Sequence, residues 1–404
     1  MRRVVVTGVG VLSAIGNNAA EFRAGLQEGR AGIAPITQTD MSVFRFRNGA
    51  EVRGFDPASH FTESHLGWLD RFAQLGLVAA REAVADAAVA WTDERRARTG
   101  VITGSCLGGI TTEDAFYFEI YHDHRPRCPP TAIPRIMSNA AASQVAMEHK
   151  FTGATFTTST ACSSSNHAIG HAFWLVRQGV LDMAVTGGSE APMAFGHLRA
   201  WESMRVVAGD TCRPFSKGRT GMILGEGGAM LVLETLESAR ARDAKIYAEI
   251  AGFGMSADAH HLTQPLPEGA ARAMNAALDD AQMARDEVSY VNAHGTGTQA
   301  NDSTETKALR LVFGERAGTL PVSSTKSMHG HTLGAAGALE AVATVFALRD
   351  GFLPPTINFV ERDPACDLDV VPNEARAAEL ESALSNSFAF GGLNAVLAFR
   401  RFRG

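Results

Sequence analysis

Short apolar runs rich in β-branched residues alternate along the chain with longer segments whose apolar residues recur at helical spacing. VVVTGVGV (4–11) precedes the amphipathic AEFRAGLQEG (20–29), and MLVLE (230–234) precedes TLESARARDA (235–244). Apolar runs of this length predict buried strands, and the segments between them predict helices that cover those strands. We therefore expect an α/β fold built in layers.

A faint internal repeat divides the chain. VVVTGVGVLS (4–13) is similar to AEIAGFGMSA (248–257), since each is a β-rich run that contains G-x-G. The first G-x-G lacks the third glycine and the following acidic residue of a dinucleotide-binding motif, so we interpret it as a turn. The repeat predicts two similar halves, residues 1–244 and residues 245–404, that meet at a central site.

Cys162 follows the β-branched run TFTTST (155–160) and precedes a predicted helix. Such a strand-to-helix turn projects a side chain out of the fold, and the helix dipole is expected to lower the pKa of the thiol. It also leaves the Cys162 N–H free to bind an oxyanion. We interpret Cys162 as a nucleophile, with a buried structural thiol as the alternative. The apolar residues at helical spacing after it are Ile169, Ala172, Phe173 and Val176.

Two further segments place histidines in glycine-rich turns after predicted strands. YVNAHGTGT (290–298) contains His294, and STKSMHGHTLGAAGALEA (324–341) contains Lys326, His329 and His331. A histidine in each of two such similar turns argues against the default interpretation of a lone surface histidine. No Glu stands beside a histidine in the H-E-x-x-H manner, so we expect no metal site.

Charge and cysteine content narrow the class of protein. The chain has 37 Lys and Arg against 43 Asp and Glu, and the net charge of −6 argues against nucleic acid as the main ligand. The five cysteines form no C-x-x-C pair, which favours a reducing cytoplasm over a disulfide framework. No segment is apolar enough to span a bilayer, and MRRVVVTGVG is more typical of a first strand than of a signal peptide.

Four motifs together resemble the β-ketoacyl-acyl carrier protein synthases of the elongating kind. They are TACSSSNHAIGHA with Cys162, NAHGTGT with His294, VSSTKSMHGHTLGAAGALE with Lys326 and His331, and NSFAFGGLNA (386–395). The resemblance covers nearly the full length in matching order. It implies a thiolase-like fold, in which two duplicated halves form a five-layered α-β-α-β-α sandwich, and a dimer as the usual assembly.

The resemblance also implies a reaction. Cys162, in the first half, takes an acyl group from an acyl carrier protein thioester while the N–H groups of Cys162 and Phe390 hold the oxyanion. Malonyl-carrier protein then loses CO₂, and neutral His294 and His331, in the second half, stabilise the enolate. The carbanion attacks the acyl group and extends it by two carbons. Lys326 is expected to orient the histidine region, and no cofactor is expected, because a phosphopantetheine arm carries the substrates.

Further residues match the family's substrate-binding positions. Thr296 and Thr298 match hydroxyls that hold the phosphopantetheine arm, Leu107 matches a residue of the acyl pocket, and Phe390, with Phe388 beside it, matches a gating phenylalanine.

Two charged residues have weaker matches. Glu305 matches a buried glutamate near the site, yet Asp302 and Glu305 also have the spacing of a capping box for the helix 303–313, and both interpretations stay open. Arg205 matches a contact to the carrier protein, although exposed arginines are common on any surface.

Departures from the family pattern suggest a specialised polyketide or nodulation-type enzyme. Ser216 and Thr220 stand where acidic residues are usual, Leu393 replaces a threonine, and residues 115–130 differ from those of housekeeping enzymes. The dimer would be of like subunits or of two related ones. A non-catalytic partner subunit is the alternative function, and the presence of Cys162 argues against it. A thioester hydrolase that uses the same cysteine is a third possible function.

Overall fold

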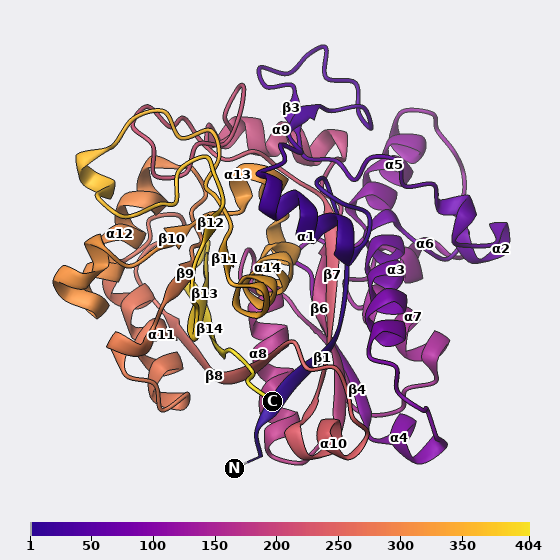
Figure 1. The fold of residues 1–404 in the computed structure, drawn as a ribbon. Helices are drawn as coiled ribbons and strands as arrows, with labels where there is room; N and C mark the ends of the chain where they lie inside the picture. Colours follow the sequence, from indigo (N-terminus) through magenta and orange to yellow (C-terminus); the bar gives the residue numbers. More distant parts are fainter. Residues whose placement is uncertain (1) are drawn as a thin grey trace.

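The computed structural model describes residues 2–404, and ten of its strands form one mixed sheet (Figure 1). Their order is β10-β9-β13-β14-β8-β1-β7-β6-β4-β5. The first five in the chain are β1 (Val4–Ser13), β4 (Thr99–Gly104), β5 (Thr155–Thr158), β6 (Met183–Glu190) and β7 (Gly227–Thr235). The second five are β8 (Ala248–Ala257), β9 (Tyr290–Asn292), β10 (Val322–Ser323), β13 (Ser382–Ala389) and β14 (Leu393–Arg400).

The two groups of five strands repeat one topology. In each group the first two pairings, counted from the middle of the sheet, are antiparallel and the next two are parallel. The groups meet where Val4–Val6 of β1 pair with residues 248–250 of β8. These two strands are the two copies of the repeat seen in the sequence, which explains why both contain buried glycines at the same spacing.

Helices fill three layers around these strands (Figure 1). The outer layers are α3 (Arg71–Asp86) with α7 (Ala140–His149) on one side, and α11 (Pro267–Asp280) with α12 (Gln299–Phe313) on the other. Between the two halves of the sheet lie α8 (Ser164–Arg177) and α14 (Ala336–Asp350), which contact each other and strands of both halves. The expected α-β-α-β-α sandwich is therefore confirmed.

The middle layer is packed through small residues. Every residue of α14 from Ala336 to Leu348 is buried, as expected for a helix covered by a sheet on each side. In α8, a Cβ added at Gly170 would come within 2.4 Å of the Phe253 ring. The N-terminal ends of α8 and α14 meet, since the Ala338 N–H of α14 donates to the Ser165 hydroxyl of α8 at 2.9 Å.

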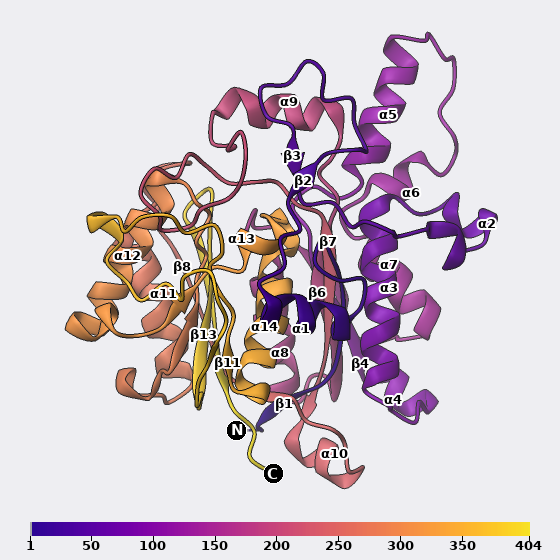
Figure 2. The ribbon, with the colours of Figure 1, turned by 45° about the horizontal axis from the view of Figure 1, so that its top comes forward.

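The remaining elements are short or peripheral. Two-stranded sheets pair β2 (Ala34–Pro35) with β3 (Asn48–Gly49) and β11 (Phe352–Leu353) with β12 (Arg376–Ala377). The other α-helices are α1 (Ala19–Glu28), α2 (Glu63–Leu66), α4 (Asp93–Ala97), α5 (Ile110–Tyr121), α6 (Ala132–Ile136), α9 (Phe195–Met204), α10 (Leu236–Ala241) and α13 (Lys326–His329). Over residues 2–404, none of the helices has the length and apolarity that crossing a membrane requires. Figure 2 shows α5 and α9 together at one end of the molecule.

Candidate active site

Cys162 lies in the tight turn between β5 and α8. Ala161 before it has a left-handed backbone with φ of 50°, which costs energy in a residue other than glycine and is typical of functional turns. The Ser164 hydroxyl holds the turn, since it accepts from Thr160 N–H at 2.9 Å and donates to the Ala161 carbonyl at 2.6 Å. This geometry turns the thiol away from the strand, and its residue is 8% exposed.

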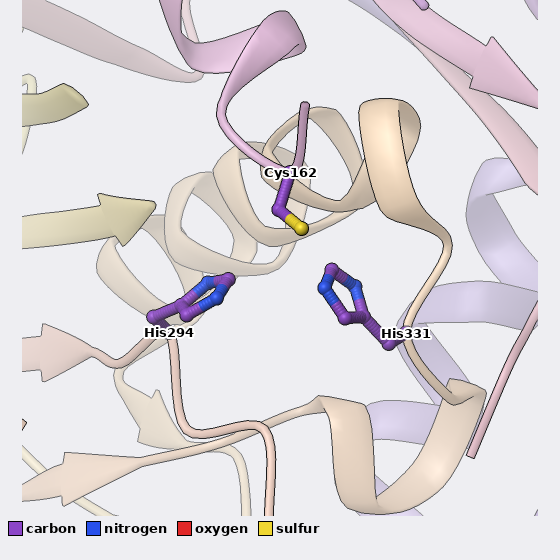
Figure 3. A group of neighbouring side chains, drawn as sticks. All are labelled: Cys162, His294 and His331. Carbon is purple, nitrogen blue, oxygen red and sulfur yellow. The ribbon is translucent and has the colours of Figure 1, made fainter. Parts of the chain in front are cut away.

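Two histidines from the second half of the chain point at this thiol (Figure 3). His294 follows β9, and His331 follows α13 just before α14. The Cys162 sulfur and one ring nitrogen of each histidine lie within 4.8 Å of one another. The two rings are nearly perpendicular, at 84°, with their centroids 5.4 Å apart. The structure thus brings together three residues separated by up to 169 positions in sequence.

Hydrogen bonds fix the tautomers of both histidines. Nδ1 of His331 accepts the Leu333 N–H at 3.2 Å, so Nε2 carries the ring proton. Nδ1 of His294 lies 3.4 Å from the Lys326 ammonium, which has only protons to donate, so Nε2 of His294 carries the proton as well. Each neutral ring therefore offers one N–H donor on the side opposite its fixed Nδ1.

Burial keeps both rings neutral. It lowers the pKa of His294 and of His331 well below the ordinary histidine value, and the Lys326 charge lowers them further. Lys326 is itself fully buried and forms an ion pair with Glu340, whose pKa burial raises to about 7 against the opposing effect of Lys326. The lysine thus acts on the histidines through charge and through one hydrogen bond.

The pKa of the Cys162 thiol is not the low value expected for a cysteine at the start of a helix. Burial raises the pKa of Cys162 to about 11, and this effect outweighs Lys326 and the N–H groups of Phe390 and Cys162, which all lower it. The predicted low pKa is therefore wrong, because the loss of water around the sulfur raises the pKa by more than the neighbouring N–H groups and Lys326 lower it. Cys162 rests as a thiol rather than as a thiolate.

Two backbone N–H groups converge on the sulfur, from Cys162 itself and from Phe390. Phe390 lies in the hairpin turn between β13 and β14 and is followed by two glycines with left-handed φ values of 85° and 68°. The Gly391 N–H donates to the Leu262 carbonyl at 2.7 Å. Paired N–H donors of this kind suit an oxyanion that forms at the carbon bound to sulfur.

A pocket leads from Cys162 toward the surface and is mostly apolar. The Thr296 and Thr298 hydroxyls, 2.9 Å apart, lie in its wall, and Thr298 also caps α12 by accepting the Asn301 N–H. The lining residues are Cys162, Trp201, Val206, Met222, His261, Leu262, Thr263, Gln264, Pro265, His294, Thr296, Thr298, Ala300, Asn301, His331, Phe388, Ala389, Phe390 and Gly392.

Glu305 supports the loop that carries His294. Its buried carboxylate accepts the N–H groups of His294 and Gly295 at 2.9 and 2.8 Å, and the amide of Asn386 at 3.2 Å. Helix α12 begins at Gln299, well before Glu305, so the capping-box interpretation is wrong. Asp302, also inside α12, accepts the N–H groups of Phe215 and Gly297 instead.

Two predicted residues are not among those that line the pocket of Cys162. Leu107 does not line the pocket of Cys162; it packs with a neighbouring apolar cluster that includes Met222 and Leu333. Its role in an acyl pocket stays a prediction. Arg205 is exposed at the left-handed end of α9, directly before Val206 of the pocket wall, and its contact to a carrier protein stays a prediction.

Sequence reasoning missed Trp201 and Glu340. Trp201 lines the pocket and stacks on Phe390; its spacing of four residues from His197 was the available signal. Glu340 is a single acid in an otherwise apolar, small-residue helix, and such a residue needs a buried cationic partner.

The Cys162, His294 and His331 trio also has the composition of a metal site. A metal would need lone pairs on the nitrogens that face the thiol, but the bonds at Nδ1 leave protons on Nε2. The buried Lys326 cation adds repulsion. The hydrogen bonding therefore favours a site that donates protons to a substrate oxygen.

Comparison with known proteins agrees with this geometry. The family model described as "Beta-ketoacyl synthase, N-terminal domain" matches residues 1–239, and "Beta-ketoacyl synthase, C-terminal domain" matches residues 247–360. The chain is 46% identical to "Nodulation protein E" of Rhizobium sp. (strain N33), over 99% of both chains, and 42% identical to "3-oxoacyl-[acyl-carrier-protein] synthase 2" of Staphylococcus aureus (strain N315), also over 99% of both.

Solved structures give the same result. "The ishigamide ketosynthase/chain length factor" superposes with a TM-score of 0.95 at 39% identity, and a β-ketoacyl synthase from Burkholderia phymatum STM815 superposes with 0.93 at 36%, each over 100% of both chains. With both family models matched in order and relatives of this identity over its full length, the chain belongs to the β-ketoacyl synthase family of acyltransferases.

Proposed function

We propose that this protein extends an acyl chain by two carbons, by decarboxylative condensation of malonyl-acyl carrier protein with an acyl group held on Cys162. The observation that carries the proposal is the convergence of four N–H donors on one thiol. Two come from the backbone of Cys162 and Phe390, and two from the neutral rings of His294 and His331. The two pairs of donors suit the two oxyanions that such a reaction forms in turn.

In the first step the Cys162 sulfur attacks the thioester carbonyl of the acyl carrier protein. The carbonyl oxygen becomes an oxyanion and accepts the N–H groups of Cys162 and Phe390. The bond to the pantetheine sulfur then breaks, and the proton lost by Cys162 ends on that departing thiol. Because the resting thiol has a high pKa, its proton leaves as the carbonyl is attacked, and the charge of Lys326 favours this change.

In the second step malonyl-carrier protein occupies the pocket and its carbon–carboxylate bond breaks to release CO₂. The electron pair passes into an enolate, whose oxygen accepts the N–H groups of His294 and His331. The enolate carbon attacks the acyl group on Cys162, a carbon–carbon bond forms, and the sulfur leaves and takes up a proton. The product is a 3-oxoacyl chain on the carrier protein.

Residues around the site suggest how the substrate arm and the partner proteins bind. We assign the Thr296 and Thr298 hydroxyls to the phosphopantetheine arm, Leu107 to the acyl pocket, and Arg205 to an acidic carrier-protein surface. One related structure is titled as a ketosynthase with its acyl-carrier protein, and another as a ketosynthase in complex with its chain length factor. We propose an acyl carrier protein and a second ketosynthase-like subunit as partners, no resident cofactor, and a cytoplasmic location.

Intact-protein mass spectrometry tests the proposal. The wild type, incubated with a panel of acyl-carrier protein thioesters, is expected to gain one acyl mass, and Cys162→Ala is expected to gain none. His331→Ala is expected to acylate but to decarboxylate malonyl-carrier protein about 100-fold more slowly. A wild type that stays unmodified across the panel, alone and with a related subunit added, would refute the proposed function.

A further inference from the structure

The turn that holds Phe390 is loosely packed at Gly391, the residue that follows the phenylalanine. A Cβ added at Gly391 would meet only the Leu393 side chain, at 3.6 Å, and both glycines of the turn have left-handed backbones. Glycine at such positions leaves many backbone conformations accessible. The Phe390 N–H can therefore stay directed at the Cys162 sulfur only if other parts of the molecule hold the turn.

The Asp258 N–H anchors the Gly392 end of the turn by donating to the Gly392 carbonyl at 2.9 Å. The Phe390–Gly391 end has two further supports. One is the bond from the Gly391 N–H to the Leu262 carbonyl, but Leu262 belongs to a surface segment and is itself 72% exposed. The other is the ring of Phe390, which stacks on the indole of Trp201 with a centroid distance of 6.0 Å and an angle of 26°. Trp201 comes from helix α9 and is half-buried, so it is a firmer contact than the exposed Leu262.

A single hydrogen bond fixes the indole. Its N–H donates to Nε2 of His197, one helical turn earlier on α9, at 2.7 Å. Burial lowers the pKa of His197 to about 4 against the opposing effect of Asp114, so the ring stays neutral and keeps its lone pair. Asp114 of α5 also accepts the Gly196 N–H, at 3.2 and 3.3 Å from its two oxygens, which ties the start of α9 to α5.

We propose that Trp201 is a positioning residue for the acyl-transfer step: its indole, held by His197, keeps the Phe390 N–H where the oxyanion forms. The inference rests on the proposed function, because it concerns the first of its two steps. It separates the two steps in structural terms. Acyl transfer uses the backbone pair that Trp201 supports, whereas decarboxylation uses His294 and His331, neither of which stacks on Trp201.

Two variants remove the bond while keeping an aromatic ring at each position, Trp201→Phe and His197→Phe. The experiment measures single-turnover acylation of Cys162 by mass spectrometry across a range of acyl-carrier protein concentrations. Each variant is expected to lower the maximal acylation rate about tenfold, because a small misplacement of a catalytic donor has effects of this order or larger. The carrier-protein concentration at half-maximal rate should change less than twofold.

Three comparisons sharpen the result. The double variant should be no slower than the slower single variant, since both changes break one bond. His197→Gln keeps an acceptor and should recover most of the rate. Ser203→Ala, an exposed change on the same helix, should match the wild type. In His197→Phe, whose residue does not line the pocket, decarboxylation of malonyl-carrier protein should change less than twofold while acylation slows about tenfold.

Different failures have different meanings. An unchanged maximal rate with a shifted half-maximal concentration would make Trp201 a wall of the pocket and overturn the inference. Equal loss of acylation and decarboxylation would indicate general damage to the site and overturn it too. A wild type that performs neither step would instead refute the proposed function, and this inference with it.

Discussion

Lys326 and Glu340 form an ion pair in which both side chains are fully buried, with the Lys326 ammonium also 3.4 Å from Nδ1 of His294. The pair joins α13 to α14 in the middle layer of the sandwich. One cation thus satisfies a buried acid and fixes a ring that faces the substrate, so stability and catalysis depend on the same side chain.

Removal of that cation should destabilise the fold. Lys326→Met leaves Glu340 buried without its partner, and breaking one side of such a pair costs about 3–5 kcal/mol. The free energy of unfolding, measured in urea, is expected to fall by this amount, and the double variant Lys326→Met/Glu340→Gln should recover part of the loss. Equal stability of the single variant and the wild type would contradict a paired Glu340.

Alkylation of Cys162 should keep accelerating at alkaline pH. With a thiol pKa near 11, the thiolate fraction rises about tenfold per pH unit up to pH 10. The rate of iodoacetamide labelling, followed by mass spectrometry with Cys162→Ala as the control, should rise in parallel. A plateau near pH 8 would show that the site lowers the pKa of the thiol after all.

Acid should weaken the fold through its buried histidines. Burial lowers the pKa of His331 far below its ordinary value. Near pH 6.5 this ring therefore binds a proton in the unfolded chain but stays neutral in the native state. The unfolding free energy therefore falls below pH 6.5, by up to about 1.4 kcal/mol per pH unit for each such ring.

His331→Gln tests this contribution. Urea unfolding of the wild type and the variant between pH 7 and pH 5 should give slopes that differ by about 1 kcal/mol per pH unit on average, the wild type being steeper. Parallel slopes would mean that His331 is protonated in the native state.

Replacement of Glu305 should displace His294. In Glu305→Gln one oxygen becomes an NH₂ group that faces a backbone N–H, so a buried donor loses its acceptor, at a cost of about 1–3 kcal/mol. We expect lower stability in urea together with slower malonyl decarboxylation, while acylation of Cys162 changes little. Decarboxylation at the wild-type rate would limit Glu305 to a structural role.

Local patterns in the sequence predicted the layers and the repeat, and the resemblance to β-ketoacyl synthases predicted that Cys162, His294 and His331 share one site. Each pattern lies within a short stretch of adjacent residues: the β-branched run before Cys162, and the glycine-rich turns around His294 and His331. The pKa of Cys162 was mispredicted because it depends on how completely distant segments exclude water from the sulfur. Glu305 was ambiguous because the start of α12, which decides whether the residue caps a helix, is set by Thr298 and not by its own spacing.

Local patterns could not predict contacts between side chains that lie far apart in sequence. The stacking of Trp201 on Phe390 joins α9 to the hairpin of β13 and β14, and no periodicity in either segment indicates it. Leu107 is a second example, since its neighbours depend on the packing of an apolar cluster whose members come from distant parts of the chain.

The repeated topology of the sheet also bears on how the enzyme is assembled. The connection from β5 to α8 carries Cys162, and its counterpart from β10 to α14 carries His331. One copy of the unit thus supplies the atom that bonds to the substrate, and the other supplies the proton donors that stabilise its charge. Neither half alone contains a working set, so catalytic competence arises only when the chain has folded to its end and the second unit has docked against the first.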